Sequence, residues 1–298
     1  MTKRLRSTLV LLILLLVMVW AVPVPAAPHG GKAPEKRAIL LVTFGTSVPE
    51  AQKVFAGIEK YFQEDFRGVD IFWAYTAEKI RKKLAAQGQE LLSPEEALAR
   101  LMAQGYTKVG VQSLHVIPGE EYTDLARVVD GFRSMSHQFH PILSPPLCNG
   151  SADLLRIRDI LLANLPKERQ PGEAVLYMGH GTPHAADMAY PALAYLLEHK
   201  DPLVYVATVE GYPALDDVLP LLKAKGVKKV WLLPFMTVAG DHAHNDMAGP
   251  EPDSWKSLLA AQGIEAVPVM KAISEIPAIV EIWAQHLQKA APGLYGSR

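Results

Sequence analysis

Cysteine is almost absent from this chain of 298 residues, and the one cysteine is Cys148. A single cysteine cannot form an internal disulfide framework or a cysteine-based zinc cluster. Any metal site must therefore use histidine, aspartate and glutamate side chains. Cys148 lies between Pro145-Pro146 and Asn149-Gly150. We expect it to be a structural residue of a crossover segment, with a catalytic thiol as the less favoured alternative.

Excess charge is also lacking, since 30 Lys and Arg residues face 31 Asp and Glu residues and the net charge is −1. That balance argues against a nucleic-acid partner bound through its phosphates. The hydrophobic content of 49% excludes a disordered chain. Neither a dinucleotide-binding glycine motif, nor a phosphate-binding loop with its lysine, nor a serine nucleophile elbow occurs. No organic cofactor is therefore expected.

The one long apolar run, Leu9–Val22, lies close to the N-terminus. Lys3, Arg4 and Arg6 precede it, and small residues up to Ala26 follow it. This order is typical of a secretory signal peptide over residues 1–26, with cleavage after Ala26 and a flexible lead-in over 27–37. We therefore expect a periplasmic protein without a stable membrane anchor after processing. The alternative is that the apolar run is retained as an anchor.

The rest of the chain alternates between strand-like and helical patterns, which predicts an α/β fold. In the first half, the expected helices span Val48–Phe62, Ser93–Gly105 and Tyr122–His137, and Pro141–Pro146 is expected to be a crossover segment. The expected strands of that half are Ala38–Thr43, Asp70–Tyr75 and Lys108–Leu114.

The second half repeats this plan through short matches in the same order. Ala38-Ile39-Leu40 with Gly45-Thr46 matches Ala174-Val175-Leu176 with Gly181-Thr182, and two further matches follow later strands. We predict two similar lobes, 38–150 and 151–298, each a parallel sheet flanked by helices, with a cleft between them at the carboxyl ends of the strands. The matches pair Phe44 with His180, Glu78 with Glu210, and Glu121 with His242.

His180, Glu210 and His242 each follow a predicted strand of the second half. Two imidazoles and one carboxylate form a borderline ligand set that suits Co²⁺, Fe²⁺, Ni²⁺ or Zn²⁺ and leaves coordination positions open. The alternative is that each residue is only a hydrogen-bonded loop residue. Their common position at strand ends favours the metal site, carried by the second lobe.

Other polar residues lie near these positions in the sequence, and we do not expect them to be the main metal ligands. His244, Asp241 and Asp246 could support a metal site or form its entry, or be solvated loop residues. Two rival local sites are His180 with His184 and His242 with His244, and Gly181-Thr182-Pro183 argues against the first because it breaks a helix. His115 could face the cleft, but a hydrogen-bonded core histidine is favoured. The surface histidines are expected to be His137, His140, His199 and His286.

Several longer segments match one known family: Leu41–Ser47, His115–Tyr122, Gly179–His184, Val209–Pro213, Pro234–Gly249 and Asp253–Lys256. With these segments the chain resembles the anaerobic, ATP-independent (class II) sirohydrochlorin cobaltochelatases. The resemblance extends from about Ile39 to about Trp283 and implies a ferrochelatase-like fold of two α/β lobes. It also implies insertion of Co²⁺ into sirohydrochlorin during cobalamin biosynthesis. The signal peptide departs from that expectation, because cobalamin is assembled in the cytoplasm.

The resemblance implies that His180 and His242 bind the metal ion, with Glu210 as the carboxylate ligand. We expect the two histidines to accept the pyrrole protons as well. The expected substrate-binding residues are Phe44, Gly45, Thr46, Glu121 and Gly181. Insertion of Fe²⁺ to give sirohaem or haem, and a non-catalytic periplasmic carrier of metal or tetrapyrrole, are the alternatives. A homo-oligomer is compatible with the sequence.

Overall fold

The computed structural model describes residues 35–294, which from Lys36 onward form one compact unit. The predicted signal peptide (1–26) and most of the predicted lead-in (27–37) lie outside the described residues. No helix within 35–294 is both long and apolar enough to cross a membrane.

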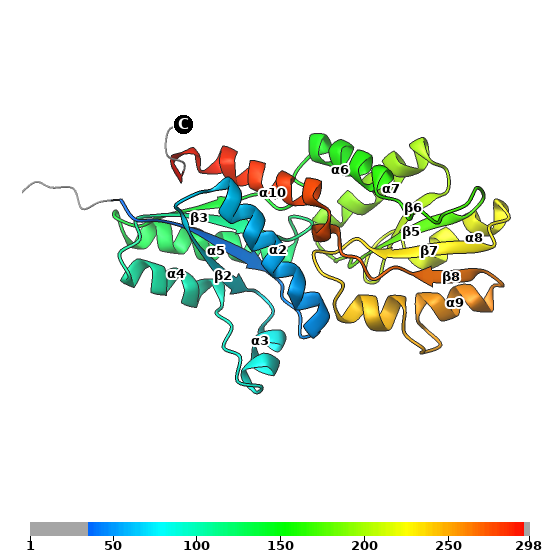
Figure 1. Cartoon of the computed structure of the whole chain (residues 1–298), viewed down its shortest axis with the longest axis horizontal. Coiled ribbons are helices and arrows are strands. Elements are labelled where there is room, and N and C mark those ends of the chain that lie inside the picture. The colour runs from blue at the N-terminus through cyan, green and yellow to red at the C-terminus, as the bar shows by residue number, and fades with distance from the viewer. Residues whose placement is uncertain (1–34, 295–298) are drawn as a thin grey trace, which may run out of the picture. The chain divides into compact units, whose positions relative to one another are not determined.

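The first lobe contains a four-stranded parallel sheet with the order β2-β1-β3-β4 (Figure 1). The three predicted strands are confirmed, but part of the expected crossover 141–146 is a fourth strand. That strand lies at the sheet edge, where a proline such as Pro141 is tolerated. The elements are β1 (Arg37–Thr43), α2 (Pro49–Asp65), β2 (Asp70–Tyr75), α3 (Glu78–Ala85), α4 (Pro94–Ala103), β3 (Lys108–Ser113), α5 (Glu120–Met135) and β4 (His140–Ser144).

The second lobe has the same topology, with the parallel order β6-β5-β7-β8. The predicted pair of α/β lobes is therefore confirmed. Its sheet and helices are α6 (Ser151–Ala163), β5 (Ala174–Gly179), η1 (Ala185–Met188), α7 (Ala189–Lys200), β6 (Val204–Thr208), α8 (Leu215–Ala224), β7 (Lys229–Pro234), η2 (Ala243–Met247), α9 (Trp255–Ala261) and β8 (Glu265–Pro268). The chain ends with η3 (Ile273–Glu275), α10 (Pro277–Ala290) and η4 (Pro292–Leu294).

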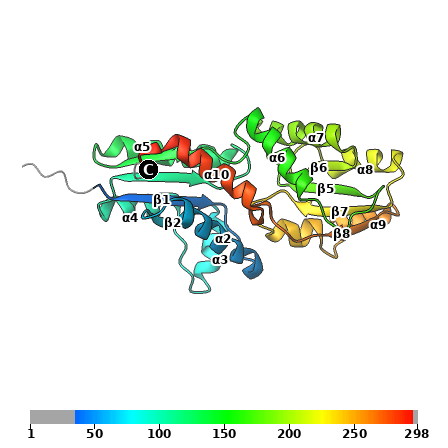
Figure 2. The same cartoon turned by 45° about the horizontal axis from the view of Figure 1, so that its top comes forward.

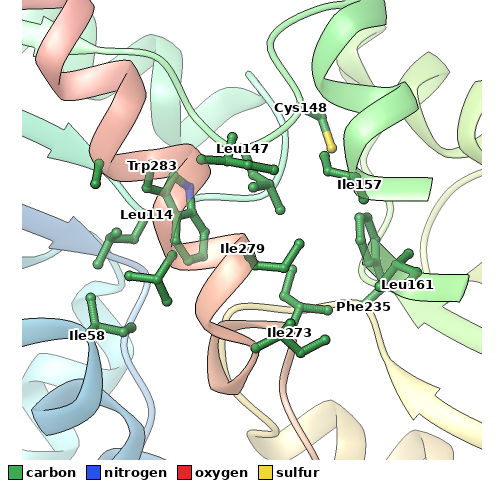
Figure 3. Close-up of a cluster of buried hydrophobic side chains, with 14 of the residues drawn as sticks. Ile58, Leu114, Leu147, Cys148, Ile157, Leu161, Phe235, Ile273, Ile279 and Trp283 are labelled. Atoms are coloured by element: carbon green, nitrogen blue, oxygen red, sulfur yellow. The ribbon is translucent and has the colours of Figure 1, made fainter. Parts of the chain in front are cut away.

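The last helix lies against the first lobe rather than the second. The predicted boundary at 150/151 separates the two sheets, yet α10 packs against β3, β4 and α2 (Figures 1 and 2). A buried cluster consequently joins both lobes: Trp283 and Ile279 of α10 belong to it together with Ile58 of α2 and Ile157 of α6 (Figure 3). This continuous apolar core fixes the lobes as one unit.

Backbone hydrogen bonds show which residues of the two lobes are equivalent. Ala77 N donates to Phe44 O, and Glu210 N donates to His180 O. The predicted pair of Phe44 and His180 is therefore confirmed. The residue equivalent to Glu210, however, is Ala77 and not Glu78. The pairing of Glu78 with Glu210 was wrong by one residue, because it followed a short chance match in sequence and not the strand register.

The predicted pair of Glu121 and His242 is confirmed by the same kind of comparison. Leu114 N bonds to Val42 O in the first lobe, as Phe235 N bonds to Met178 O in the second. After these strands, Gly119 O and Gly240 O accept equivalent helix-starting bonds, from Thr123 N and His244 N. Glu121 and His242 both lie in the first turn of the segment that follows.

Candidate active site

A cavity of about 790 Å³ lies at the carboxyl ends of the strands and is lined by both lobes. This is the position expected for ligands of parallel sheets, and the volume is that of a small-molecule site. The structure thus brings together most of the residues predicted from sequence. The predicted residues that line the cavity are Phe44, Gly45, Thr46, Glu121, His180, Gly181 and His242.

The wall from the first lobe begins in the turn after β1. Gly45 has φ of 98°, a conformation that favours glycine, and a Cβ there would lie 3.1 Å from a ring carbon of Tyr75. Thr46 is buried and its hydroxyl accepts a bond from Val48 N at 3.1 Å. Phe44, between β1 and this turn, leaves 44% of its surface exposed. The rigid turn therefore holds a large apolar ring at the cavity.

The wall from the second lobe carries the histidine pair. The rings of His180 and His242 lie with their centroids 4.6 Å apart and are nearly perpendicular, at 89°. Both side chains are partly exposed, 42% for His180 and 34% for His242. Two imidazoles at this separation can reach a common ion.

The hydrogen bonds of the two histidines define which ring nitrogen is free. His180 Nδ1 lies 2.8 Å from Gly181 O, and His242 Nδ1 lies 2.5 Å from Asp246 Oδ2. A carbonyl or carboxylate oxygen only accepts, so each Nδ1 carries the proton. In the neutral rings the lone pair is then on Nε2, the usual arrangement of a metal-binding histidine. Asp246 thus orients the His242 ring through this hydrogen bond, which is the contact expected of a residue that supports a metal ligand.

Glu210 lies beside this pair but does not complete a formed site. Its carboxylate is 4.0 Å from Nδ1 of His180, and its side chain is 58% exposed. Across residues 35–294, no three His, Cys, Asp or Glu side chains lie close enough together to hold a metal ion. The Glu210 carboxylate approaches the protonated Nδ1 of His180 and not the free Nε2. The three predicted ligands are therefore not arranged to share one ion in this structure. The exposed Glu210 side chain has room to change rotamer.

His115 faces the cavity, although a core position was favoured from sequence. Its Nδ1 lies 2.8 Å from the Ser113 hydroxyl, and its Nε2 lies 3.4 Å from that of Thr76. Burial lowers the pKa of His115 to about 4. At neutral pH this side chain is therefore an uncharged, hydrogen-bonded part of the wall.

The other histidines and Cys148 lie outside the site. His137, His140 and His199 are exposed, as predicted. The prediction for His286 was wrong, because it is 7% exposed and its Nε2 lies 3.1 Å from Asp153 Oδ1. The sequence around His286 is polar and helical, which indicated a surface position. In the structure, however, the first lobe and α6 cover α10. Cys148 is buried, and burial raises the pKa of its thiol, as expected for a structural residue.

The remaining loop residues have separate positions. Asp241 lines the main cavity. His244 lines a second cavity, of about 730 Å³, between α2 and the start of α10. His184 caps η1, since its Nδ1 accepts a bond from Ala186 N at 3.1 Å. Only Asp246, of the four candidates, contacts a predicted ligand through a hydrogen bond among the described residues.

Sequence reasoning missed Asp187 of η1, which joins the loops that carry His180 and Glu210. Its Oδ1 accepts from Thr182 N at 3.0 Å, and its Oδ2 accepts from Tyr212 N at 2.8 Å. No local pattern marks this residue, because its two partners lie on opposite sides of it in the sequence. Only the packing of η1 between the loops brings the three together.

The fold and site define a two-lobed α/β protein with paired imidazoles in its cleft, the architecture of a tetrapyrrole metal chelatase. The sequence profile of the cobalt chelatase (CbiK) family matches residues 37–292. The chain belongs to this family.

Two relatives named as sirohydrochlorin cobaltochelatases match most of the chain. The sirohydrochlorin cobaltochelatase CbiKC of Nitratidesulfovibrio vulgaris strain Hildenborough is 42% identical over 259 residues, covering 87% of this chain and 92% of the relative. The sirohydrochlorin cobaltochelatase of Salmonella typhimurium is 37% identical over 257 residues, covering 86% and 96%.

Two solved structures share the fold at much lower sequence identity. The sirohydrochlorin chelatase SirB from Bacillus subtilis subspecies spizizenii, in complex with cobalt, superposes with a TM-score of 0.59 at 15% identity and covers 87% of this chain and 96% of its own. CbiX, described as the terminal enzyme of sirohaem biosynthesis in denitrifying bacteria, gives a TM-score of 0.54 at 12% identity, with 86% and 99% covered.

Proposed function

We propose that this chain is a sirohydrochlorin cobaltochelatase, which inserts Co²⁺ into sirohydrochlorin without ATP as a step of cobalamin biosynthesis. The observation that carries the proposal is the pair of His180 and His242 at the cavity, each with Nδ1 hydrogen-bonded and Nε2 available. Both relatives described above bear the name of this activity, and each matches this chain along most of its length.

Metal insertion requires a bound ion and the loss of two pyrrole protons. His180 and His242 hold Co²⁺ through Nε2, and Glu210 turns its exposed carboxylate toward the same ion as a third ligand. One Co²⁺ replaces two protons on the macrocycle, so charge is balanced in the product. As Co²⁺ passes to the macrocycle, the imidazoles of His180 and His242 are released from the ion, and each accepts one of the two pyrrole protons and passes it to water at the open cavity.

The tetrapyrrole lies against the first lobe, opposite the ion. Phe44 packs its exposed ring on the macrocycle face. Backbone N–H groups of the turn at Gly45 face carboxylates of the substrate, as amides at helix starts do. Thr46 holds this turn in shape, and Glu121 lines the same wall. Gly181 lines the cavity from the second lobe, and the amide after it, Thr182 N, is bonded to Asp187.

Fe²⁺ insertion is the second candidate, since two imidazoles and a carboxylate discriminate little between Co²⁺ and Fe²⁺. A spectrophotometric assay of the purified chain from Ala27 with sirohydrochlorin and each metal tests both reactions. Rapid catalytic insertion of Co²⁺ supports the proposal, and faster insertion of Fe²⁺ contradicts the metal assignment. A spectral change that stops at one equivalent of protein indicates a carrier of metal or tetrapyrrole instead.

We also propose that the protein works in the periplasm after cleavage behind Ala26. The basic residues, the apolar run and the small residues of 1–26 support this. Fractionation of cells and N-terminal sequencing of the exported protein test it. An intact Met1 in the membrane fraction contradicts it and indicates a retained anchor.

A further inference from the structure

Two loops of the second lobe carry a predicted histidine ligand and the predicted carboxylate ligand. The loop after β5 holds His180, Gly181 and Thr182, and the loop after β6 holds Glu210 and Gly211, followed by Tyr212. They contact each other directly, since Glu210 N donates to His180 O at 2.8 Å. The position of one ligand therefore depends on the backbone of the other.

Asp187 joins the same two loops from outside. Its two carboxylate oxygens each accept one backbone N–H, from Thr182 at 3.0 Å and from Tyr212 at 2.8 Å. Each of these amides lies two residues beyond a predicted ligand, Thr182 beyond His180 and Tyr212 beyond Glu210. One half-buried side chain thus fixes both loops at matching points.

The glycines of the loops show how tightly this arrangement is packed. A Cβ on Gly181 would lie 2.3 Å from Gly211 N, and a Cβ on Gly211 would lie 2.2 Å from Asp187 Oδ1. Gly181 also has φ of 82°, which favours glycine. The loops can approach each other and Asp187 only because both positions lack a side chain.

The first lobe holds its equivalent loop differently. There Thr46 O accepts from the Gln52 side chain at 3.0 Å, and the Thr46 hydroxyl accepts from Val48 N. These bonds stabilise the turn after β1 within itself. A carboxylate that ties the two loops together is therefore specific, within residues 35–294, to the lobe that carries the predicted ligands.

We propose that Asp187 is a positioning residue, which sets the reach of the Glu210 carboxylate to an ion held by His180 and His242. This inference rests on the proposed function for its choice of metal. A carboxylate is needed because two amides must be accepted at once, one on each oxygen. In Asp187→Asn the amide side chain keeps one acceptor and presents N–H groups to the other backbone donor, so one loop is released.

Titration of the protein alone with Co²⁺ tests this. We expect Asp187→Asn to weaken Co²⁺ binding about 10–100-fold, the range found when groups that orient metal ligands are removed. The visible absorption of bound Co²⁺ should change with its coordination. In turnover, KM for Co²⁺ should rise more than KM for sirohydrochlorin, because Asp187 does not line the cavity itself and reaches the substrate only through the loop of Gly181 and Thr182.

A matched control makes the same substitution at an aspartate that accepts a single backbone N–H, a bond that the Asn side chain can keep. Asp217 accepts from Ala214 N at 2.8 Å at the start of α8. Asp217→Asn should leave Co²⁺ binding unchanged, and circular dichroism should show both variants folded. If Asp187→Asn does not fold, Gly211→Ala replaces it, because the new Cβ displaces the Asp187 carboxylate from the other side.

A double-mutant cycle with Glu210→Gln decides whether Asp187 acts through Glu210. If it does, Asp187→Asn should change Co²⁺ affinity less than about twofold in the Glu210→Gln background. The inference is overturned if the losses of Co²⁺ affinity in the two single variants multiply in the double variant. It is also overturned if Asp187→Asn binds Co²⁺ as tightly as the wild type. If the wild-type protein binds Co²⁺ but never inserts it, the proposed function is refuted. The Co²⁺ titrations of the variants then still test whether Asp187 positions the ligands.

Discussion

The two lobes have the same strand order and register but different side chains at the ends of their strands. Where the second lobe has His180, Glu210 and His242, the first has Phe44, Ala77 and Glu121. The fold is thus used twice, and within residues 35–294 the second copy alone presents paired imidazoles. The comparison teaches that the scaffold supplies equivalent positions, while the residue at each position sets the chemistry of its wall: imidazoles in the second lobe, and an apolar ring in the first.

The lobes differ a second time, in the middle of their sheets. Gly110 of β3 pairs with Ile39, as Trp231 of β7 pairs with Val175, so glycine and tryptophan occupy equivalent positions. A Cβ on Gly110 would lie 2.3 Å from Leu294 Cδ1 and 2.8 Å from Leu287 Cδ1. The small residue makes room for the C-terminal helix, which covers the first sheet and joins the lobes.

The largest effect is expected where the lobes differ in chemistry. His180→Ala and His242→Ala should each lower the rate of Co²⁺ insertion more than about 100-fold, because a metal ligand contributes several kcal/mol. The rate is measured by absorbance with sirohydrochlorin, and thermal unfolding checks the fold. His199→Ala, at an exposed position of α7, is the control and should keep full activity. Insertion at the wild-type rate by either cavity variant would exclude that histidine as a ligand.

The next effect concerns the difference between Gly110 and Trp231. Gly110→Ala should destabilise the protein by about 1–3 kcal/mol, because the added methyl overlaps buried Leu287 and Leu294. Urea unfolding measures the change. Gly57→Ala in α2 is matched, since its Cβ meets nothing within 4 Å, and it should stabilise the helix by about 0.5–1 kcal/mol. Equal stability of the two variants would contradict the packing role of Gly110.

Much of this molecule could be predicted from its sequence. The apolar runs and the Ser93–Glu96 capping box, which the structure contains, located strands and helices. Short repeats gave the equivalence of Phe44 with His180. The slip at Glu78 arose because a strand register is set by hydrogen bonds between distant segments. Asp187, the cavity position of His115 and the burial of His286 all depend on contacts between elements far apart in sequence.

A smaller effect should follow from the apolar wall. Phe44→Ala should raise KM for sirohydrochlorin about 3–10-fold, since an aromatic contact contributes about 0.5–1.5 kcal/mol. Co²⁺ binding to the protein alone should not change, which separates this wall from the one with the histidines. Steady-state kinetics and Co²⁺ titration provide the two readouts. Weaker Co²⁺ binding by this variant would show that the walls do not divide their tasks.

The smallest effect concerns His115, whose equivalent in the second lobe is Met236. Burial holds the pKa of His115 at about 4, whereas the unfolded chain has a value of about 6.5. Below pH 6.5 the unfolded state therefore binds the extra proton, so this residue lowers stability as the pH falls toward 4, and the loss levels off below that. Since His115 faces the cavity, water stabilises part of the charge, and the loss should stay below the roughly 3 kcal/mol that a change of pKa from about 6.5 to about 4 allows. Urea unfolding from pH 7 to pH 4 should show a smaller loss for His115→Met than for the wild type. The exposed His137→Met serves as control, and a pH profile of His115→Met that matches the wild type would contradict the assigned pKa.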